Sequence, residues 1–319
     1  MIQGFWEKLK KPFFALAPMH EITDIAFRQM FIKYGKPDVF YTEFVSADGL
    51  SSQGKEKLLP YLAFKKNERP IVAQIFGSKP DNFFKAAKLI KALKFDGIDI
   101  NMGCPDKTIM KQGAGATLIK NPKLAREIIR ATQQGAEQLP VSIKTRPGYD
   151  KNVLTTWLPE LLMETPAAIA IHARTKKEMF STPANWNVIK EAVILAKKSK
   201  TLIIGNGDIN NLKEAKNKAK ETGADGIMIG RAAIGRPWIF NCKTKNQLIS
   251  PKEKITLAKK HLFLFNKYFQ KTKNFAALKK FFNVYIADFP LAKKIRIELM
   301  ETTNIIDAQK ILKKYLSIL

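Results

Sequence analysis

The sequence of 319 residues contains few of the side chains that bind metals or form disulfides. Its two cysteines, Cys104 and Cys242, exclude a disulfide framework and a zinc site built from several thiolates. Only three histidines occur, His20, His172 and His261, which argues against a histidine-rich metal site. We therefore expect no metal, and we expect any catalysis to depend on an organic cofactor.

Long apolar runs are also absent from the sequence. None reaches the ~18 residues that a membrane-spanning helix needs. The first residues, MIQGFWEK, lack the apolar core of a signal peptide. We therefore expect a cytoplasmic protein without a membrane partner.

Acidic side chains are scarce relative to basic ones. The chain has 28 Asp and Glu against 55 Lys and Arg, for a formal net charge of +27. A basic surface of this size attracts polyanions by counterion release and by long-range steering, so nucleic acid is the leading partner. The alternative is that the lysines reflect a general compositional bias and are spread over solvated faces.

Short apolar runs alternate with helical patterns through the first three quarters of the chain. Each run is followed by a turn signal and then by a helix, which is typical of a parallel sheet covered by helices. Eight such runs predict a (β/α)8 TIM barrel, and a doubly wound open sheet is the alternative. The expected strands are residues 13–18, 38–43, 71–76, 97–102, 141–146, 168–173, 202–207 and 226–231. The expected helices are residues 23 onward, 81–93, 122–134, 155–164, 186–198 and 211–222.

The pattern changes after about residue 241. Residues 245–319 lack strand alternation and have apolar residues at helical spacing. They carry 16 Lys or Arg against 5 Asp or Glu, a net charge of +11. We predict a catalytic barrel over residues 1–243 and a small, basic, all-α domain that binds RNA over residues 244–319.

Polar residues and glycines gather where the expected strands end. In a TIM barrel these ends open on one face, so residues far apart in sequence would meet there. The last two strands end in GNGD (205–208) and GR (230–231), a combination suited to a phosphate group. The competing interpretation is a pair of tight turns between strand and helix.

Three further side chains at strand ends suit a flavin. Lys144 would be costly to bury in the barrel mouth without a negative partner, such as the pyrimidine end of a reduced flavin. His172 can donate a hydrogen bond to the same group, and the amide of Gln74 can bind its paired donor and acceptor edge. The alternatives are a surface lysine, a buried structural histidine and a glutamine satisfied by nearby backbone.

Cys104 follows the expected strand 97–102 and lies between Gly103 and Pro105. The position is compatible with a reactive thiol at the barrel mouth. It is equally compatible with a small residue in a turn.

The chain resembles the tRNA-dihydrouridine synthases, flavoenzymes that reduce uridine in transfer RNA. The joint presence of NMGCP (101–105), GNGDI (205–209) and MIGR (228–231) is highly specific for them. The likeness runs in order from about residue 13 to 240 and continues more weakly through the tail. The matching stretches are residues 16–19, 23–24, 27–28, 42–47, 74, 76–78, 99–105, 113–116, 144–146, 171–175, 205–209 and 223–231.

The resemblance implies FMN as the cofactor, NADPH or NADH as the reductant, and tRNA as the substrate. It assigns Cys104 as the proton donor in catalysis. The implied cofactor-binding residues are Pro18, Met19, His20, Gln74, Lys144, His172, Asn206, Gly207, Asp208, Gly230 and Arg231. The implied substrate-binding residues are Asn101, Arg174, Lys279 and Lys280.

The sequence departs from the family pattern in two places. His20 and Glu21 stand where small residues are common after Pro18 and Met19. In the tail, Lys279, Phe281 and Asn283 stand where the family usually has Arg, His and Trp.

The expected reaction reduces the C5–C6 double bond of uracil by a hydride at C6 and a proton at C5. A thiol near its ordinary pKa is protonated at neutral pH and can supply that proton. Two other functions remain to be weighed. One is an FMN barrel oxidoreductase acting on a free pyrimidine or another small metabolite, for which the basic tail has no use. The other is a non-catalytic RNA-binding protein, for which Cys104, Lys144 and His172 have no use.

Overall fold

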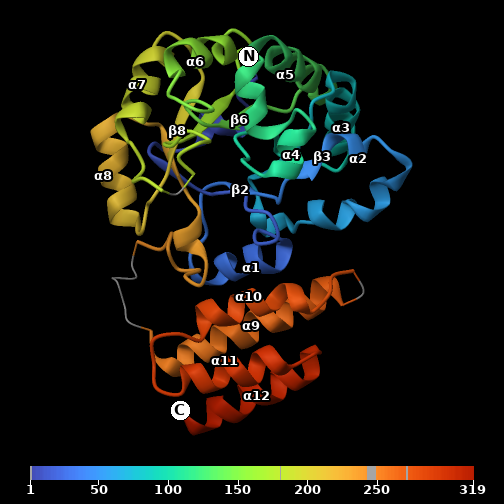
Figure 1. Cartoon of the computed structure of the whole chain (residues 1–319), viewed down its shortest axis with the longest axis vertical. Coiled ribbons are helices and arrows are strands. Elements are labelled where there is room, and N and C mark those ends of the chain that lie inside the picture. Colours follow the sequence, from blue (N-terminus) through green and yellow to red (C-terminus); the bar gives the residue numbers. More distant parts are fainter. Residues whose placement is uncertain (1, 180, 243–248, 271) are drawn as a thin grey trace.

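The computed structural model describes residues 2–179, 181–242, 249–270 and 272–319. A parallel sheet closes into a barrel with helices around it, and a bundle of helices follows at one side (Figure 1). Within the described ranges, no helix is both long enough and apolar enough to cross a membrane.

The strands form one sheet in the order β1-β9-β8-β7-β6-β5-β4-β2, and all their pairings are parallel. A parallel bridge between Ala15 and Val39 joins the two edges of this sheet. The predicted TIM barrel is therefore confirmed, and the open sheet is excluded. The strands are β1 (Phe13–Leu16), β2 (Phe40–Tyr41), β3 (Val45–Ser46), β4 (Ile71–Phe76), β5 (Gly97–Met102), β6 (Val141–Thr145), β7 (Ala168–His172), β8 (Leu202–Asn206) and β9 (Gly226–Ile229).

Most of the helices around the barrel begin at local signals in the sequence. For example, the side chain of Asn121 accepts a hydrogen bond from the N–H of Leu124, and Pro122 occupies the first turn of α5. The α-helices here are α1 (Ile25–Tyr34), α2 (Ala47–Leu50), α3 (Pro80–Ala92), α4 (Lys107–Lys111), α5 (Pro122–Ala136), α6 (Leu154–Leu162), α7 (Asn187–Ala196) and α8 (Leu212–Thr222). The short 3-10 helices are η1 (Gly4–Lys8), η2 (Gln53–Lys57), η3 (Leu59–Leu62), η4 (Lys66–Glu68), η5 (Gly115–Lys120) and η6 (Arg231–Ala233).

Six of the eight predicted strands are shorter in the structure, and two of them, the second and the last, end early for clear local reasons. The second ends early because the hydroxyl of Thr42, in place of a backbone carbonyl, accepts the N–H of Gln74 at 3.2 Å. The short β3 then pairs with the end of β4. The last strand ends at Ile229 because Gly230 turns the chain away from the sheet and into η6.

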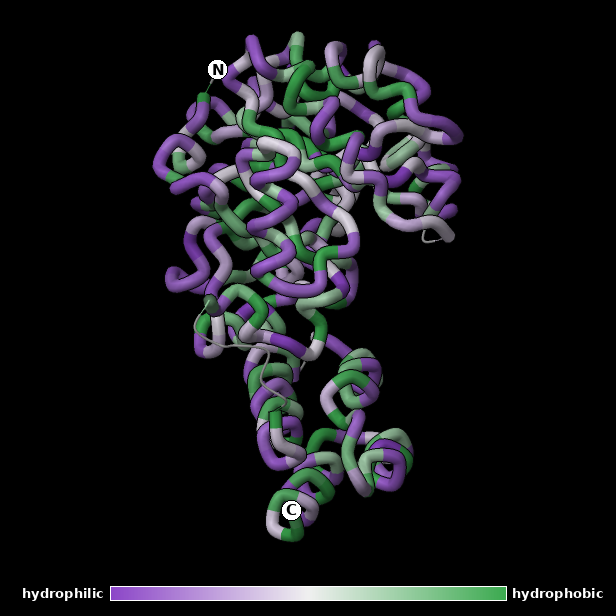
Figure 2. Tube along the Cα trace, turned by 90° about the vertical axis from the view of Figure 1, so that its left-hand side faces the viewer, coloured by the Kyte–Doolittle hydropathy of each residue, from purple (hydrophilic) through white to green (hydrophobic). Residues whose placement is uncertain are grey.

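The C-terminal part consists of four helices: α9 (Pro251–Phe269), α10 (Ala276–Tyr285), α11 (Ala292–Glu301) and α12 (Ile305–Ile318). They project from the barrel beside α1, and the C-terminus lies at the far end (Figures 1 and 2). A capping box between Ser250 and Glu253 starts α9. The predicted domain boundary between residues 243 and 244 lies outside the described residues.

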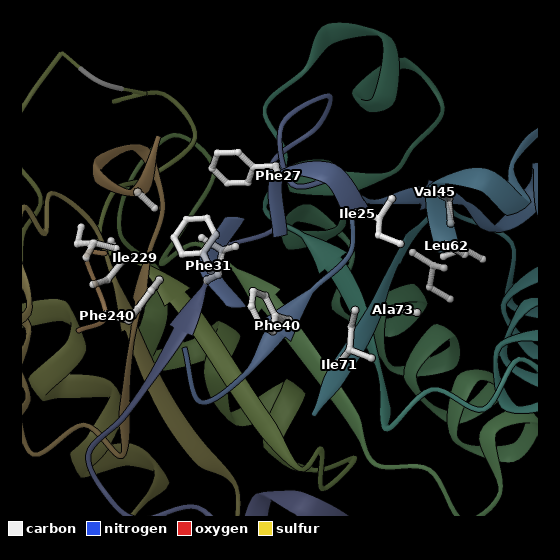
Figure 3. Packing of buried hydrophobic residues seen from close by; sticks show 14 of the residues in the cluster. Ile25, Phe27, Phe31, Phe40, Val45, Leu62, Ile71, Ala73, Ile229 and Phe240 are labelled. Atoms are coloured by element: carbon white, nitrogen blue, oxygen red, sulfur yellow. The ribbon is translucent and has the colours of Figure 1, made fainter. Parts of the chain in front are cut away.

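Apolar packing joins the barrel to the helical part through α1. Phe31 of α1 packs toward Phe40 of β2, with ring centroids 6.5 Å apart (Figure 3). On the other side, Phe27 packs against His261 of α9 and Phe281 of α10, at 6.0 and 5.6 Å. A single cluster of buried apolar side chains therefore continues from the barrel into the helical bundle.

An ion-pair network reinforces the same junction. Nζ of Lys273, between α9 and α10, lies 3.1 Å from a carboxylate oxygen of both Asp24 and Glu43. All three side chains are largely buried. Burial alone would lower the pKa of Lys273, but the two carboxylates outweigh it and raise that pKa. A charged lysine of the helical part is thus held between two acidic residues of the barrel.

A buried ion pair joins α1 to η4, just before β4, and it gives a test of stability. Arg28 Nε lies 2.7 Å from Glu68 Oε2, and both side chains are fully buried. We expect Arg28→Met to lower the free energy of unfolding by about 3–5 kcal/mol, because it leaves a buried carboxylate without its cation. Urea denaturation measures this loss.

The matched control is Lys218→Met, which breaks the more exposed pair of Lys218 and Glu221 on α8. This variant should lose less than about 1 kcal/mol. Equal losses in the two variants would contradict the structural role of the buried pair.

Candidate active site at the barrel mouth

A pocket of about 610 Å3 opens at the carboxyl ends of β1 and β6 to β9. Its size is within the usual range for cofactor and ligand sites. Most of the predicted cofactor residues line it: Pro18, Met19, Lys144, His172, Asn206, Gly207, Asp208, Gly230 and Arg231. The barrel therefore brings together side chains from five strands, as the sequence analysis expected.

A larger hollow, of about 800 Å3, lies at the opposite end of the barrel. Lysines such as Lys10, Lys36 and Lys216 contribute much of its wall. We place the chemistry in the smaller pocket, because TIM barrels carry their active sites at the carboxyl ends of the strands.

Lys144 brings positive charge into the pocket from β6. Its Nζ donates a hydrogen bond of 3.2 Å to Oδ1 of Asn206, whose Nδ2 donates to the carbonyl of Met228 at 2.8 Å. Burial, together with the charge of the nearby Arg146, lowers the pKa of Lys144 to about 8. At neutral pH the side chain is still mostly protonated.

His172 lies beside this lysine at the end of β7. Burial lowers its pKa to about 2, and the charges of Lys144 and Arg146 add to the effect, so the imidazole is neutral. Nη1 of Arg146 lies 3.2 Å from Nδ1 of His172. Because a guanidinium can only donate, Nδ1 is the acceptor and the ring hydrogen is on Nε2.

Arg146 is a site residue that the sequence analysis did not assign. It follows β6 in the motif KTR, two residues after Lys144. Residues two apart in an extended chain point to the same side, so this spacing could have indicated that Arg146 lies beside Lys144. Its Nε also donates to the carbonyl of Gly103 at 2.7 Å. Arg146 thus connects the pocket to the loop that carries Cys104.

Asp208 organises the corner formed by the last two strands. Its carboxylate accepts hydrogen bonds from Nη1 of Arg174 at 2.9 Å, Nη2 of Arg231 at 2.7 Å and the N–H of Ala184 at 2.9 Å. Gly207 has a φ of +143°, and a Cβ there would lie 2.8 Å from that of Ala184. Only glycine therefore fits this turn without displacement.

A buried polar network lies under the mouth, between β4 and β6. Asp99 accepts hydrogen bonds from Nε2 of Gln74 at 2.7 Å and from the hydroxyl of Ser142 at 2.6 Å. Oε1 of Gln74 accepts from Nδ2 of Asn101 at 3.1 Å. Burial raises the pKa of Asp99 to about 6, although both donors act in the opposite direction.

Cys104 occupies a defined turn after β5. Oδ1 of Asn101 accepts hydrogen bonds from the N–H groups of Gly103 and Cys104, at 3.2 and 3.0 Å. The carbonyl of Cys104 accepts the N–H of Ala116 at 3.0 Å. Burial raises the pKa of the half-buried thiol, so it is protonated at neutral pH.

Seven predicted site residues lie outside the set that lines the pocket: Gln74, Asn101 and Cys104, described above, and His20, Arg174, Lys279 and Lys280. Arg174 is buried behind the pocket wall, against Asp208. His20 is exposed and stacks on Phe44, with ring centroids 4.9 Å apart. Lys279 donates to the carbonyl of Met300 at 2.6 Å, and Lys280 pairs with Glu21 at 3.0 Å. Their assigned roles stay predictions.

The family model for dihydrouridine synthase (Dus) matches residues 15–318. The chain belongs to the dihydrouridine synthase family. The match covers the barrel and the four C-terminal helices alike, so the resemblance noted in the sequence is confirmed. This dihydrouridine synthase is therefore an oxidoreductase, and a non-catalytic RNA-binding protein is not supported.

Curated relatives of this dihydrouridine synthase match over its full length. A protein of Staphylococcus aureus (strain COL), named probable tRNA-dihydrouridine synthase, is 38% identical over 320 residues, which cover 99% of this chain and 96% of that protein. Probable tRNA-dihydrouridine synthase 2 of Bacillus subtilis (strain 168) is 38% identical over 325 residues, 99% of each chain.

Solved structures share the fold at low sequence identity. Histamine dehydrogenase from Rhizobium sp. 4-9 has a TM-score of 0.56 at 12% identity, covering 79% of this chain and 48% of that one. A 2-naphthoyl-CoA reductase complex has a TM-score of 0.56 at 11% identity, covering 71% and 49%. These similarities support the barrel fold alone.

The raised pKa of Asp99 predicts an unusual pH dependence of stability. The folded protein keeps a proton on Asp99 up to about pH 6, whereas the unfolded chain releases it near pH 4. Stability contributed by this proton is therefore lost as the pH rises through that window. We expect the free energy of unfolding of Asp99→Asn, relative to wild type, to increase by on the order of 2 kcal/mol between pH 4.5 and pH 7.

Urea denaturation at several pH values measures this difference. Ser142→Ala is the control, because it removes a donor to Asp99 but keeps the carboxyl group. Its stability should retain the pH dependence, with the window moved to higher pH. A difference between Asp99→Asn and wild type that does not change with pH would refute the burial argument.

Proposed function

We propose that this chain is a tRNA-dihydrouridine synthase. It binds FMN in the mouth of the barrel, uses NADPH or NADH as the reductant, and reduces the C5–C6 double bond of specific uridines in tRNA. The observation that carries the proposal is the pocket, which combines the cationic Lys144 with a neutral His172 that can donate a hydrogen bond. The chain also matches the named relatives over 99% of its length.

The residues of the pocket fit a flavin ring. Lys144 is half-buried and benefits from a negative partner, which the pyrimidine end of a flavin provides. Nε2 of His172 carries a hydrogen that it can donate to the same end. Gln74 donates one amide hydrogen to Asp99 and is fully buried below the pocket, so a contact with the cofactor would use its second amide hydrogen from below. When bound, the flavin supplies the hydride for C6 of uracil.

The corner formed by β8 and β9 fits the phosphate of FMN. Gly207 and Gly230 line the pocket there and carry no side chain that could obstruct a ligand. Arg231 donates to Asp208 and lines the pocket at this corner, where its guanidinium suits a phosphate. Asp208 and Arg174 then act behind the phosphate, by orienting Arg231 and the turn.

Cys104 supplies the proton for C5 in this proposal. Its raised pKa keeps the proton on Sγ before the reaction. Addition of a hydride at C6 would place negative charge at C5, which would take the proton from Sγ and leave a thiolate. Asn101 keeps one amide hydrogen after its bond to Gln74, and that hydrogen is available to hold the uracil. The same side chain fixes the turn of Cys104, so base and acid are positioned together.

The helical part, over residues 244–319, is the proposed tRNA-binding domain. Its net charge of +11 suits contacts with phosphates. Lys279 and Lys280 of α10 are two of the residues that we expect to make such contacts. The target uridine has to leave its stack before it can enter the pocket. An enzyme for a free pyrimidine would have no use for this basic surface.

The role of Cys104 can be tested by Cys104→Ala. We expect the variant to keep its flavin and to reduce tRNA about 100- to 10,000-fold more slowly, because the general acid is lost. The measurement is the rate at which the prereduced enzyme is reoxidised by tRNA in a single turnover. Cys242→Ala, the same change at an exposed cysteine, should leave the rate unchanged. A wild-type rate in Cys104→Ala would rule out the assignment.

The role of the tail can be tested by neutralising lysines. We expect Lys279→Ala with Lys280→Ala to weaken tRNA binding and to reduce the slope of log affinity against log salt by about 0.9 per lost phosphate contact. The matched control removes the same charge from Lys197 and Lys198, two exposed residues after α7. Equal effects of the two pairs would mean that net charge, and not the tail, determines binding.

A further inference from the structure

Three aromatic side chains lie in contact along one side of the barrel mouth. His20 follows β1, Phe44 follows β2 and Phe76 ends β4. The ring of His20 stacks on that of Phe44, with centroids 4.9 Å apart and planes inclined by 21°. Phe44 meets Phe76 edge to face at 5.5 Å. We call this set the mouth aromatics.

The mouth aromatics adjoin the proposed active site at both ends. Met19, the neighbour of His20, lines the pocket. Gln74, two residues before Phe76 on β4, is hydrogen-bonded to Asn101, which in turn fixes the turn of Cys104. The set therefore borders the site from the end of β1 to the loop after β5.

The helical part reaches the barrel along the same side. Glu21, next to His20, pairs with Lys280 of α10 at 3.0 Å. Glu43, next to Phe44, pairs with Lys273 at 3.1 Å. An RNA held on the basic helices therefore meets the mouth aromatics on its way to the pocket. The same ion pairs also reduce the repulsion that Glu21 and Glu43 would exert on the phosphates of the RNA.

His20 offers a free ring face at this place. The side chain is exposed while one of its faces lies on Phe44, so solvent reaches the opposite face. Proteins hold unpaired RNA bases by stacking them on aromatic side chains, including histidine. We propose that His20, supported by Phe44, is a stacking surface for a nucleobase that flanks the target uridine. This proposal rests on the proposed function of the chain.

The variant His20→Ala tests the stacking surface. Loss of one stacked base should raise the KM for tRNA about 5- to 150-fold, with a much smaller change in kcat. His20→Phe should restore a KM close to that of wild type, because it keeps an aromatic face. Phe84→Ala, at a partly exposed phenylalanine of α3, is the matched control and should behave as wild type.

A change in the RNA separates stacking from a structural role of His20. An abasic nucleotide next to the target uridine should raise the KM of the wild-type enzyme and have little further effect in His20→Ala. Additive effects of the two changes, or a KM of His20→Ala equal to that of wild type, would overturn the proposal. Loss of bound flavin in His20→Ala would also overturn it, in favour of a cofactor contact.

The proposed function has its own control in this experiment. If the wild-type enzyme holds flavin but reduces no tRNA, the proposed function is refuted, and the proposed stacking surface with it. If the wild-type enzyme reduces tRNA and His20→Ala does so with the same KM, only the proposed stacking surface is refuted.

Discussion

The rest of the site depends on the positive charge that the barrel concentrates at the ends of β6 and β7. Lys144 and Arg146 share a half-buried space with His172, and the three cannot all carry a proton there. The imidazole is the group that loses its proton, and its neutral form then carries a hydrogen on Nε2 that it can donate. The remaining cations are best stabilised by an anionic ligand, so the pocket is prepared for a cofactor with negative charge.

The neighbouring acidic groups offset this charge only in part. Asp99 lies below the mouth, and burial raises its pKa to about 6, so at neutral pH it is mostly ionised and favours the charged form of Lys144. Asp208 is on the far side, where Arg174 and Arg231 share its carboxylate. The pocket therefore has the cations of Lys144 and Arg146 at one end and the guanidinium of Arg231 at the other. Both features suit a ligand that carries a flavin ring and a phosphate.

The junction of barrel and helices gives the basic tail a defined place. Lys273 is held by Asp24 and Glu43, and the rings of Phe27 and Phe281 pack nearby. A positively charged bundle on a flexible linker would attract RNA but would not hold it in a fixed orientation relative to the pocket. In the proposed function, the bundle docked in this way would present tRNA to the side of the mouth that carries His20 and Cys104.

Much of this organisation was predictable from the sequence, since it depends on local patterns. Apolar runs followed by turns identified the barrel strands, and the motifs at their ends identified Lys144, His172 and Asp208. The shorter second strand could not be predicted, because it depends on a hydroxyl of Thr42 replacing a carbonyl in the ladder. The bond from Arg146 to His172 was also missed, since it joins residues on different strands.

The sequence by itself determined the fold class, the basic tail and the family, because periodicity, charge and motif spacing are properties of neighbouring residues. Only the tertiary structure decided which ring nitrogen of His172 carries the hydrogen, where Lys273 finds its partners and which face of His20 is open. Each of these depends on groups that are distant in the chain and share one small volume. Burial there changes protonation and leaves few alternative contacts.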